Sequence, residues 1–183
     1  MAPKPKMALI LPQLHVLKAL EDHLNRWKSL DWIEEQIRLP DESSESAELV
    51  GGILACSNLS TITCIELPSR IRQTPLRTWI HQNDFEIISF TIDPSQDLLT
   101  LVEILNSNAT LSLNVHLRTL SGNTPHPRVS DITHPTYIPK NQTRLLSDGD
   151  AYRFSVMGDS IALLDDDQRT VSIWNWCTGT LIY

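Results

Sequence analysis

Short apolar runs separated by polar turns fill most of this chain, and this pattern predicts β-strands. From Phe85 to Pro127 the order is strand, tight polar turn, apolar strand, loop, strand and Ser-Gly turn. A shorter copy of the same order runs from Arg153 to Tyr183. Two copies of one β unit predict a repeat architecture of antiparallel sheets.

The first copy contains a strand that is apolar on both faces. Its predicted segments are the strand 88–92, the turn 93–96, the strand 98–102 and the strand 113–120, ended by the turn Ser121-Gly122. Ile88, Phe90 and Ile92 alternate with other residues and should share one face of their strand. Leu98 to Val102 is apolar at odd and even positions, which is typical of a strand covered on both sides.

The second copy predicts a similar unit. Its segments are a strand ending at 156, the turn Met157-Gly158-Asp159, the strand 161–164, the loop Asp165–Asp167, the strand 171–176 and the turn Thr178-Gly179. Trp174-Asn175 stands where WD-type repeats often carry Trp-Asp. The polar, Pro-rich stretch Ser121–Asp150 is interpreted as an insertion between the two copies.

One helix is predicted upstream of the β units. Leu17, Leu20, Leu24 and Trp27 follow helical spacing within a helix at 14–30. Their face is interpreted as covering the core of its own domain, and a partner-binding groove is the alternative. The acidic, Ser-rich stretch after Pro40 is predicted to be a linker. It divides the chain into 1–40, the tail and helix, and 41–183, the β domain.

A hairpin is predicted from the strands 48–57 and 61–67. Gly51-Gly52, inside the first of these strands, indicates a bulge or a close approach of another backbone. Cys56 and Cys64 lie in apolar segments and are interpreted as buried thiols.

These units predict a mainly β fold: a partial, open β-propeller of about three blades behind an N-terminal α-helix. Closed propellers usually have roughly 4–8 blades, each of roughly 40–45 residues in the WD type. The residues after Pro40 suffice for about three blades. Two apolar blade faces or open strand edges should therefore remain.

Composition narrows the class of function. The chain has 183 residues, a formal net charge of -7 and no clustered basic residues, so no nucleic-acid partner is expected. No apolar run approaches the ~18 residues of a membrane-spanning helix, so no membrane association is expected. The three cysteines form no Cys-x-x-Cys pair, which favours a reduced compartment, cytoplasmic or nuclear.

Candidate catalytic and metal-binding motifs are few. Met157-Gly-Asp-Ser160 is similar to the nucleophile turn of GDS-type hydrolases, but no histidine follows position 134, so a turn between strands is the preferred interpretation. Asp165–Asp167 lacks the alternating ligands and the glycine of a calcium loop. Two histidine pairs match no zinc spacing: His15/His23 and His126/His134. We therefore expect no enzyme activity, no catalytic residue, no cofactor and no metal.

A set of short segments follows one another in a recognisable order: Asn25–Trp32, Gly51–Ala55, Leu67–Arg70, Phe90–Glu103, His116–Gly122, Pro125–Pro127 and Trp174–Gly179. In these segments and in their order, the chain resembles the fungal F-box proteins that expanded in mushroom-forming fungi. Together the segments extend over residues 14–183. Asp93-Pro-Ser-Gln-Asp-Leu-Leu99 is quite specific to the family.

The resemblance implies a protein-interaction module. In that family an N-terminal F-box docks the protein onto a cullin-type ubiquitin ligase, and the propeller-like part behind it is thought to hold the substrate. We find no F-box before the predicted helix, and the sequence stops just after Trp174-Asn-Trp176. The implied function is therefore recognition of an unknown protein target, and a Skp-type adaptor is not expected to bind.

The insertion Ser121–Asp150 is the predicted variable contact region. Two alternatives to a protein-interaction function stay open. In the first, the chain is a truncated remnant without adaptor activity. In the second, it is a small hydrolase that uses the Gly158-Asp159-Ser160 turn.

Overall fold

The structure is a computed structural model that describes residues 10–31, 36–37, 46–69, 72–106, 111–129, 152–165 and 169–183. The chain divides into two compact units, Met1–Pro40 with Pro68–Leu76, and Asp41–Leu67 with Arg77–Tyr183. The first unit contains helix α1 (Ile10–Ser29), and the second contains the strands. The predicted segments 107–110, 130–151 and 166–168 lie outside the described residues, as does Trp32.

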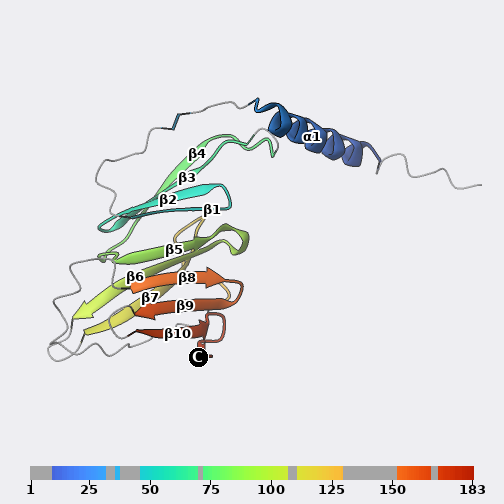
Figure 1. Ribbon diagram of the computed structural model, residues 1–183. Coiled ribbons are helices and arrows are strands. Elements are labelled where there is room, and N and C mark those ends of the chain that lie inside the picture. The colour runs from blue at the N-terminus through green and yellow to red at the C-terminus, as the bar shows by residue number, and fades with distance from the viewer. Residues whose placement is uncertain are drawn as a thin grey trace, which may run out of the picture. The chain divides into compact units, whose positions relative to one another are not determined.

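The strands form three antiparallel sheets (Figure 1). Sheet 1 has the order β1 (Ser46–Val50), β2 (Ile53–Asn58), β3 (Thr61–Glu66) and β4 (Arg77–Gln82). Sheet 2 has the order β5 (Ser89–Asp93), β6 (Leu98–Asn106) and β7 (Leu111–Thr119). Sheet 3 has the order β8 (Tyr152–Met157), β9 (Ser160–Asp165), β10 (Thr170–Asn175) and β11 (Thr180–Leu181).

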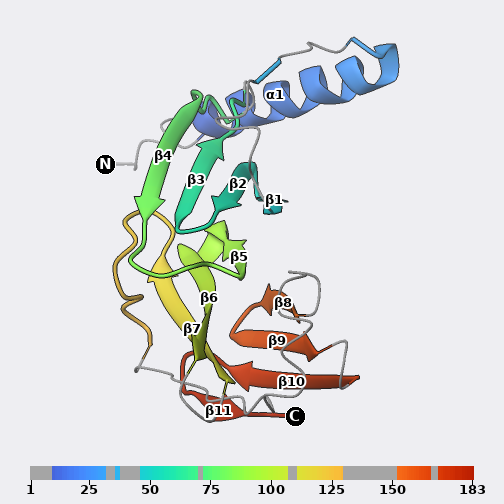
Figure 2. The same ribbon diagram turned by 90° about the vertical axis from the view of Figure 1, so that its left-hand side faces the viewer.

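The first strands of the three sheets are neighbours, β1 beside β5 and β5 beside β8 (Figures 1 and 2). The described strands form no closed barrel. The predicted fold class, mainly β with about three open propeller-like sheets and an N-terminal helix, is confirmed.

Two hydrophobic cores hold the sheets together, one on each side of sheet 2. Strand β6 contributes to both, because Leu98 and Val102 join the core with sheet 3, whereas Leu99 and Leu101 join the core with sheet 1. All four side chains are 0% exposed. The prediction of a strand covered on both sides is confirmed, and it explains why this run lacks polar alternation.

Two local predictions were wrong, and one strand was not predicted. Gly51-Gly52 is not a bulge in one strand but the tight turn between β1 and β2, and both glycines have positive φ, 60° and 88°. Strand β4 was not predicted. Ile88 packs against the core shared with sheet 3, whereas Phe90 and Ile92 join the other core, because Ile88 lies before β5 begins.

The other prediction made for Gly51, a close approach of another backbone, is not what the structure shows, because the nearest atoms belong to the side chain of Pro94. A Cβ atom at Gly51 would lie 3.4 Å from Cγ of Pro94, in the turn after β5. That distance is an ordinary van der Waals contact, so glycine is favoured here for its positive φ and not for its size.

Sheet 2 stops at three strands because prolines follow it. The chain turns after β7 and runs back beside it, so that Arg118 forms an isolated bridge with Pro125 and the His126 N–H donates to the Leu117 carbonyl at 2.9 Å. Pro125 and Pro127 have no N–H to donate, so this segment cannot extend the ladder as a full strand.

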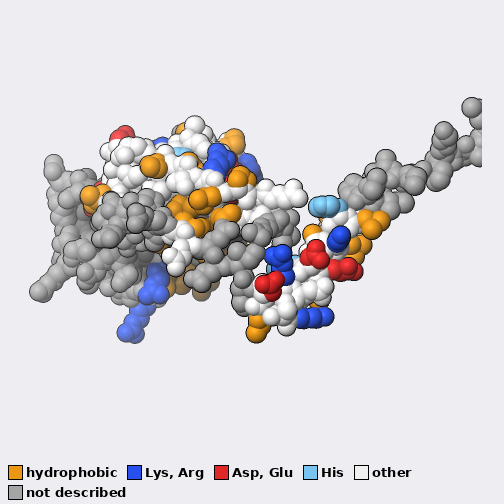
Figure 3. Space-filling view, turned by 90° about the horizontal axis from the view of Figure 1, so that it is seen from above, with side chains coloured by type: hydrophobic (Ala, Val, Ile, Leu, Met, Phe, Trp, Pro, Cys, Tyr) orange, Lys and Arg blue, Asp and Glu red, His pale blue; other side chains and the backbone are white. Residues whose placement is uncertain are grey.

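Helix α1 begins one turn earlier than predicted and has Pro12 in its first turn, where a missing N–H is tolerated. Its spaced apolar residues are each more than half exposed: Leu17, Leu20, Leu24 and Trp27. Figure 3 shows such hydrophobic side chains beside acidic and basic ones. The interpretation that this face covers a core stays a prediction.

One buried threonine has no hydrogen bond, and its replacement should stabilise the protein. Thr100 on β6 is 0% exposed, and its hydroxyl has no partner among the described residues. Burying an unpaired hydroxyl is unfavourable, so Thr100→Val should raise the free energy of unfolding by about 1 kcal/mol in urea titrations.

Thr91 is the matched control because it lies opposite Thr100 in the β5–β6 ladder. Its hydroxyl donates to Oε1 of Glu48 at 3.0 Å. Thr91→Val should therefore lower the free energy of unfolding by about 1–2 kcal/mol. Equal effects of the two substitutions would contradict this account.

Candidate functional site

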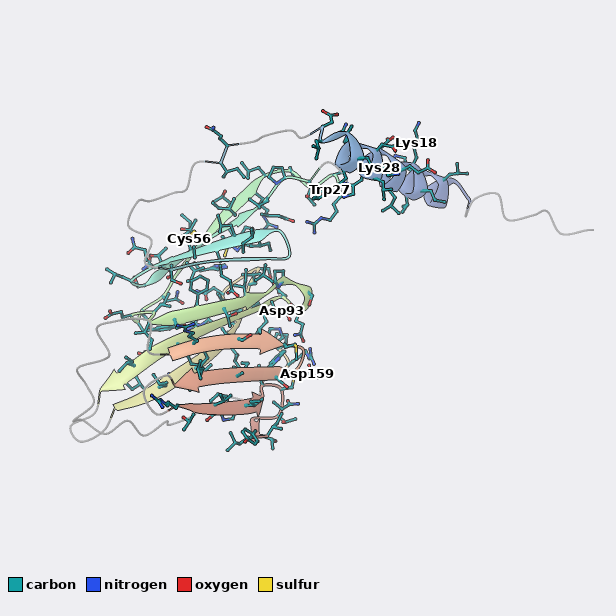
Figure 4. All side chains as sticks on the ribbon, viewed as in Figure 1. Lys18, Trp27, Lys28, Cys56, Asp93 and Asp159 are labelled. Carbon is teal, nitrogen blue, oxygen red and sulfur yellow. The ribbon has the colours of Figure 1, made fainter. Side chains whose placement is uncertain are left out.

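A network of hydrogen bonds joins the turns of sheets 2 and 3. We call it the turn cluster and define it by four segments: Asp93–Asp97, Pro125–Val129, Met157–Asp159 and Trp176–Gly179. Figure 4 labels Asp93 and Asp159, which lie on neighbouring turns.

The first segment is shaped by its own sequence. Asp93 caps the short 3-10 helix Pro94–Gln96, and its Oδ1 accepts from the Ser95 N–H at 3.0 Å and the Ser95 hydroxyl at 2.6 Å. Partial burial alone would raise the pKa of Asp93, but hydrogen bonds from Ser95 and Gln96 outweigh it and lower that pKa. The Asp-Pro-Ser-Gln motif therefore holds a charged, fixed turn.

Gln96 connects this turn to sheet 3. Its Nε2 donates to Oδ2 of Asp93 and to the Gly158 carbonyl, each at 2.8 Å. Its Oε1 accepts from Nη1 of Arg128 at 2.9 Å. One amide thus ties together three of the four segments, which lie up to 62 residues apart in sequence.

Arg128 forms the exposed part of the cluster with Asp159. Its Nη2 lies 2.8 Å from Oδ1 of Asp159, and the two side chains are 48% and 54% exposed. The guanidinium carbon also lies 4.9 Å from the ring centroid of Trp176. The aromatic ring and Gln96 fix the orientation of the guanidinium, so the ion pair is preorganised at the surface.

Trp176 and His126 form the buried base of the cluster. Trp176 is 1% exposed, and its Nε1 donates to the Gly158 carbonyl at 2.8 Å. His126 packs edge-on against it, with ring centroids 5.0 Å apart. The Arg128 N–H donates to Nδ1 of His126, which leaves Nε2 to donate to the Gln96 carbonyl at 3.0 Å. Both histidine nitrogens thus have structural partners.

The groups of the turn cluster favour binding over covalent chemistry. Sγ of Cys177 lies 3.7 Å from Oδ1 of Asp159. Burial raises the pKa of the Cys177 thiol, and the Asp159 carboxylate raises it further, against a lowering by Arg128. A raised pKa keeps this thiol protonated, whereas nucleophilic cysteines are thiolates.

The structure places Gly158 and Asp159 in the turn between β8 and β9, and Ser160 is the first residue of β9. Ser160 pairs with Met157 and Asn175 in the ladders. Its neighbour Asp159 forms an ion pair with Arg128. Among the described residues, Asp159 has no hydrogen bond to a histidine. The structure therefore shows this motif as a turn between two strands, which is the interpretation preferred from the sequence.

The other residues singled out from the sequence lie apart from the turn cluster. His15 and His23 lie on α1, where Nε2 of His23 accepts from Nε1 of Trp27 at 3.0 Å. Asp165 ends β9, and His134 lies outside the described residues. Across the described ranges, no group of three or more His, Cys, Asp or Glu side chains could hold a metal ion.

Cys56 and Cys64 are buried in sheet 1, as predicted. Burial, together with the nearby Cys56, raises the pKa of Cys64 to about 12. This thiol is therefore a core side chain and not a reactive one.

A second polar group lies on the face of sheet 2 that faces sheet 1. Oε2 of Glu103 lies 2.9 Å from Nε2 of His116 and also accepts from Nδ2 of Asn114 at 3.3 Å. Phe85 stacks on His116 with centroids 4.1 Å apart. These side chains hydrogen-bond to or stack on one another. We therefore interpret the group as part of the packing between the sheets.

Glu48 links sheets 1 and 2 at their first strands. Its two carboxylate oxygens accept from the Thr91 hydroxyl and from the Ile92 N–H, each at 3.0 Å. Burial raises the pKa of Glu48 above its ordinary value of 4.5, and the two hydrogen bonds only partly offset this. A raised carboxyl pKa means that the folded state binds the proton more tightly than the unfolded state.

Glu48 should therefore make stability fall with rising pH. Its contribution is fully present below its ordinary pKa and is lost as the pH rises through the raised one. Glu48→Gln keeps an acceptor for Ile92 but cannot ionise. We expect the variant to gain stability relative to the wild type as the pH rises above the ordinary pKa of 4.5 in urea titrations. Parallel pH profiles would contradict this.

No family model matches the chain, and no curated protein or solved structure matches it either. In the part of the chain that the structure describes, no helix is long and apolar enough to cross a membrane. The fold and the turn cluster therefore carry the functional proposal.

Proposed function

We propose that the three-sheet array is a protein-binding module, and that the turn cluster is its contact surface. The observation that carries this is the set of hydrogen bonds through Gln96, which fixes turns from two sheets in one arrangement. Rigid scaffolds that present loops or turns are the usual basis of recognition in repeat proteins.

The exposed chemistry of the turn cluster suits a protein partner. Met157 is 82% exposed beside the Gly158-Asp159 turn, and the Arg128–Asp159 pair is half exposed. Methionine and arginine are enriched in protein interfaces, where an apolar anchor is surrounded by polar groups. A preorganised surface loses little conformational entropy on binding.

The resemblance to fungal F-box proteins supports a more specific version of this proposal. The target would be a substrate protein, as for the propeller-like part of an F-box ubiquitin-ligase adaptor. The Asp93-Pro-Ser-Gln motif that carries much of the resemblance is also the turn that organises the cluster. Capture of a Skp-type adaptor by the full chain would add ligase recruitment to this function.

Substitution of Met157 tests the proposed surface. Affinity capture with the full chain and quantitative mass spectrometry would identify candidate partners, and purified partners would give a dissociation constant. Met157→Asp should weaken the interaction at least about tenfold, since it places a charge at the apolar anchor. Because Met157 is exposed, folding should be unaffected.

Leu59→Asp is the matched control, since Leu59 is a 54% exposed apolar residue in the turn between β2 and β3. It should leave binding unchanged. A partner that binds wild type and Met157→Asp equally would refute the turn cluster as the contact surface.

A further inference from the structure

Strand β4 is the outer edge of sheet 1, and it lacks the features that protect the outer edges of sheets 2 and 3 (Figure 2). The edge of sheet 2 is blocked by the prolines that follow β7, and β11 at the edge of sheet 3 has only two residues. Strand β4 has six residues and contains neither proline nor lysine. Proteins usually prevent pairing at a sheet edge with prolines, lysines or very short strands. The β4 edge is therefore open to a further strand.

The ladder between β3 and β4 shows which backbone groups of β4 point outward. The Asn83 N–H donates to the Ser60 carbonyl at 2.8 Å, so these two residues form a hydrogen-bonded pair that continues the ladder. Hydrogen-bonded pairs alternate with other pairs along an antiparallel ladder. Trp79 and His81 therefore direct their N–H and C=O groups toward β3.

Thr78 and Ile80 direct their N–H and C=O groups away from β3. These four groups have no hydrogen-bond partner among the described residues. The next outward carbonyl, that of Gln82, accepts from Nδ2 of Asn123 at 3.2 Å, as expected for this direction. The side chains of Thr78 and Ile80 are exposed, that of Ile80 by 63%. A row of unpaired N–H and C=O groups binds an extended backbone by adding it as a strand.

A second copy of β4 fits this edge in antiparallel orientation. A two-fold axis beside Trp79 places Thr78 of each copy opposite Ile80 of the other. The four outward groups of one copy then form hydrogen bonds with the same four groups of the second copy. The two-fold axis itself makes the two strands antiparallel, which is the orientation of the ladders within all three sheets.

The side chains of β4 are complementary to themselves in this register. Trp79 lies opposite Trp79 of the second copy, and the β-branched Thr78 lies opposite the β-branched Ile80. Aromatic cross-strand pairs stabilise sheets, and β-branched residues pack well on a pleated surface. Arg77 lies opposite His81 of the second copy and not opposite its own copy, so the two guanidinium groups stay on opposite sides of the axis. The edge therefore suits its own copy, and not only an extended backbone in general.

We propose that the chain forms a two-fold dimer in which β4 pairs with β4 of a second copy. The two four-stranded sheets would then form one continuous antiparallel sheet. The four segments of the turn cluster include no residue of β4, so the dimer does not depend on the proposed function.

Sedimentation velocity of the full chain over a concentration series tests the dimer. The wild type should dimerise reversibly. Ile80→Lys should raise the dissociation constant at least about tenfold, because it places a charge at the paired edge. Thr78→Pro should have a similar effect, because it removes an outward N–H that the ladder with β3 does not use. Circular dichroism of both variants should show an unchanged fold.

Val171→Lys is the matched control, because Val171 is 45% exposed on β10, which lies inside sheet 3. It makes the same change at an exposed β-branched residue away from the edge and should leave the dimer intact. Loss of the dimer in Val171→Lys, with Ile80→Lys unaffected, would place the contact on sheet 3 and would overturn the proposal. A wild type that stays monomeric at every concentration would overturn it as well.

Hydrogen exchange of single amides, followed by NMR, tests the pairing directly. In the dimer the N–H groups of Thr78 and Ile80 should exchange slowly, and in monomeric Ile80→Lys the Thr78 N–H should exchange fast. The N–H groups of Trp79 and His81 are the internal control, because they bond to β3 in both states and should stay protected. A dimer in which the Thr78 and Ile80 amides exchange fast would contradict pairing through β4.

Discussion

Replacing Trp176 by alanine is expected to lower the free energy of unfolding by about 3–5 kcal/mol. The side chain is 1% exposed, so the substitution leaves a large cavity in the core between sheets 2 and 3. It also removes the donor to the Gly158 carbonyl and the ring that supports Arg128. Packing and polar losses add at this one position, which is why the expected effect is large.

Chemical denaturation followed by circular dichroism measures this cost. Trp176→Phe retains an aromatic ring but not the indole N–H, so it should cost less than the alanine substitution, yet at least the ~1 kcal/mol of a lost hydrogen bond. Trp27→Ala is the matched control, because Trp27 is 57% exposed on α1, and its effect should stay within about 0.5 kcal/mol. A cost below about 1 kcal/mol for Trp176→Ala would mean that this ring does not hold the sheets together.

Features that depend on local pattern were predictable from the sequence. The run Leu98–Val102 has apolar residues at both odd and even positions, which is typical of a strand packed on both faces. The Asp93 turn followed from its own residues, since aspartate, proline and serine each favour a turn for a separate physical reason. These two features locate the middle sheet, whose β6 strand is covered on both faces.

Strand β4 was missed because its pattern is inverted. Ile80 is 63% exposed, whereas the polar His81 is 7% exposed. The buried histidine is satisfied by the Leu120 carbonyl at 2.7 Å, which Trp79 also contacts at 3.0 Å. That acceptor lies about 40 residues further along the chain, so no local rule of alternation could place these side chains on the buried face.

The turn cluster was missed for a similar reason. Gln96, Arg128 and Asp159 are ordinary surface residues in sequence, and only the stacking of sheets 2 and 3 brings them within hydrogen-bonding distance. Some signal was present nonetheless. The segments Asp93–Leu99, Pro125–Pro127 and Trp174–Gly179 all carried the family resemblance, and the structure brings these three together.

Truncating two adjacent leucines of β6 should destabilise different sheets. Leu98 and Leu99 are both 0% exposed, but Leu98 belongs to the core with sheet 3 and Leu99 to the core with sheet 1. Each Leu→Ala substitution should lower the free energy of unfolding by about 2–5 kcal/mol, because each leaves a cavity in a different interface. In a stacked array each sheet is stabilised by its direct neighbours. The loss of stability should therefore be largest in the sheet that packs against the truncated leucine.

Hydrogen exchange of backbone amides distinguishes the two effects. Leu98→Ala should reduce protection mainly in β8, β9 and β10, whereas Leu99→Ala should reduce it mainly in β2 and β3. Each variant is the control for the other, since the residue type, the strand and the exposure are the same. Identical protection patterns would show that the three sheets open as one unit, and that the two cores are not separable. Opposite patterns would show that sheet 2 is the shared support through which the outer sheets are stabilised.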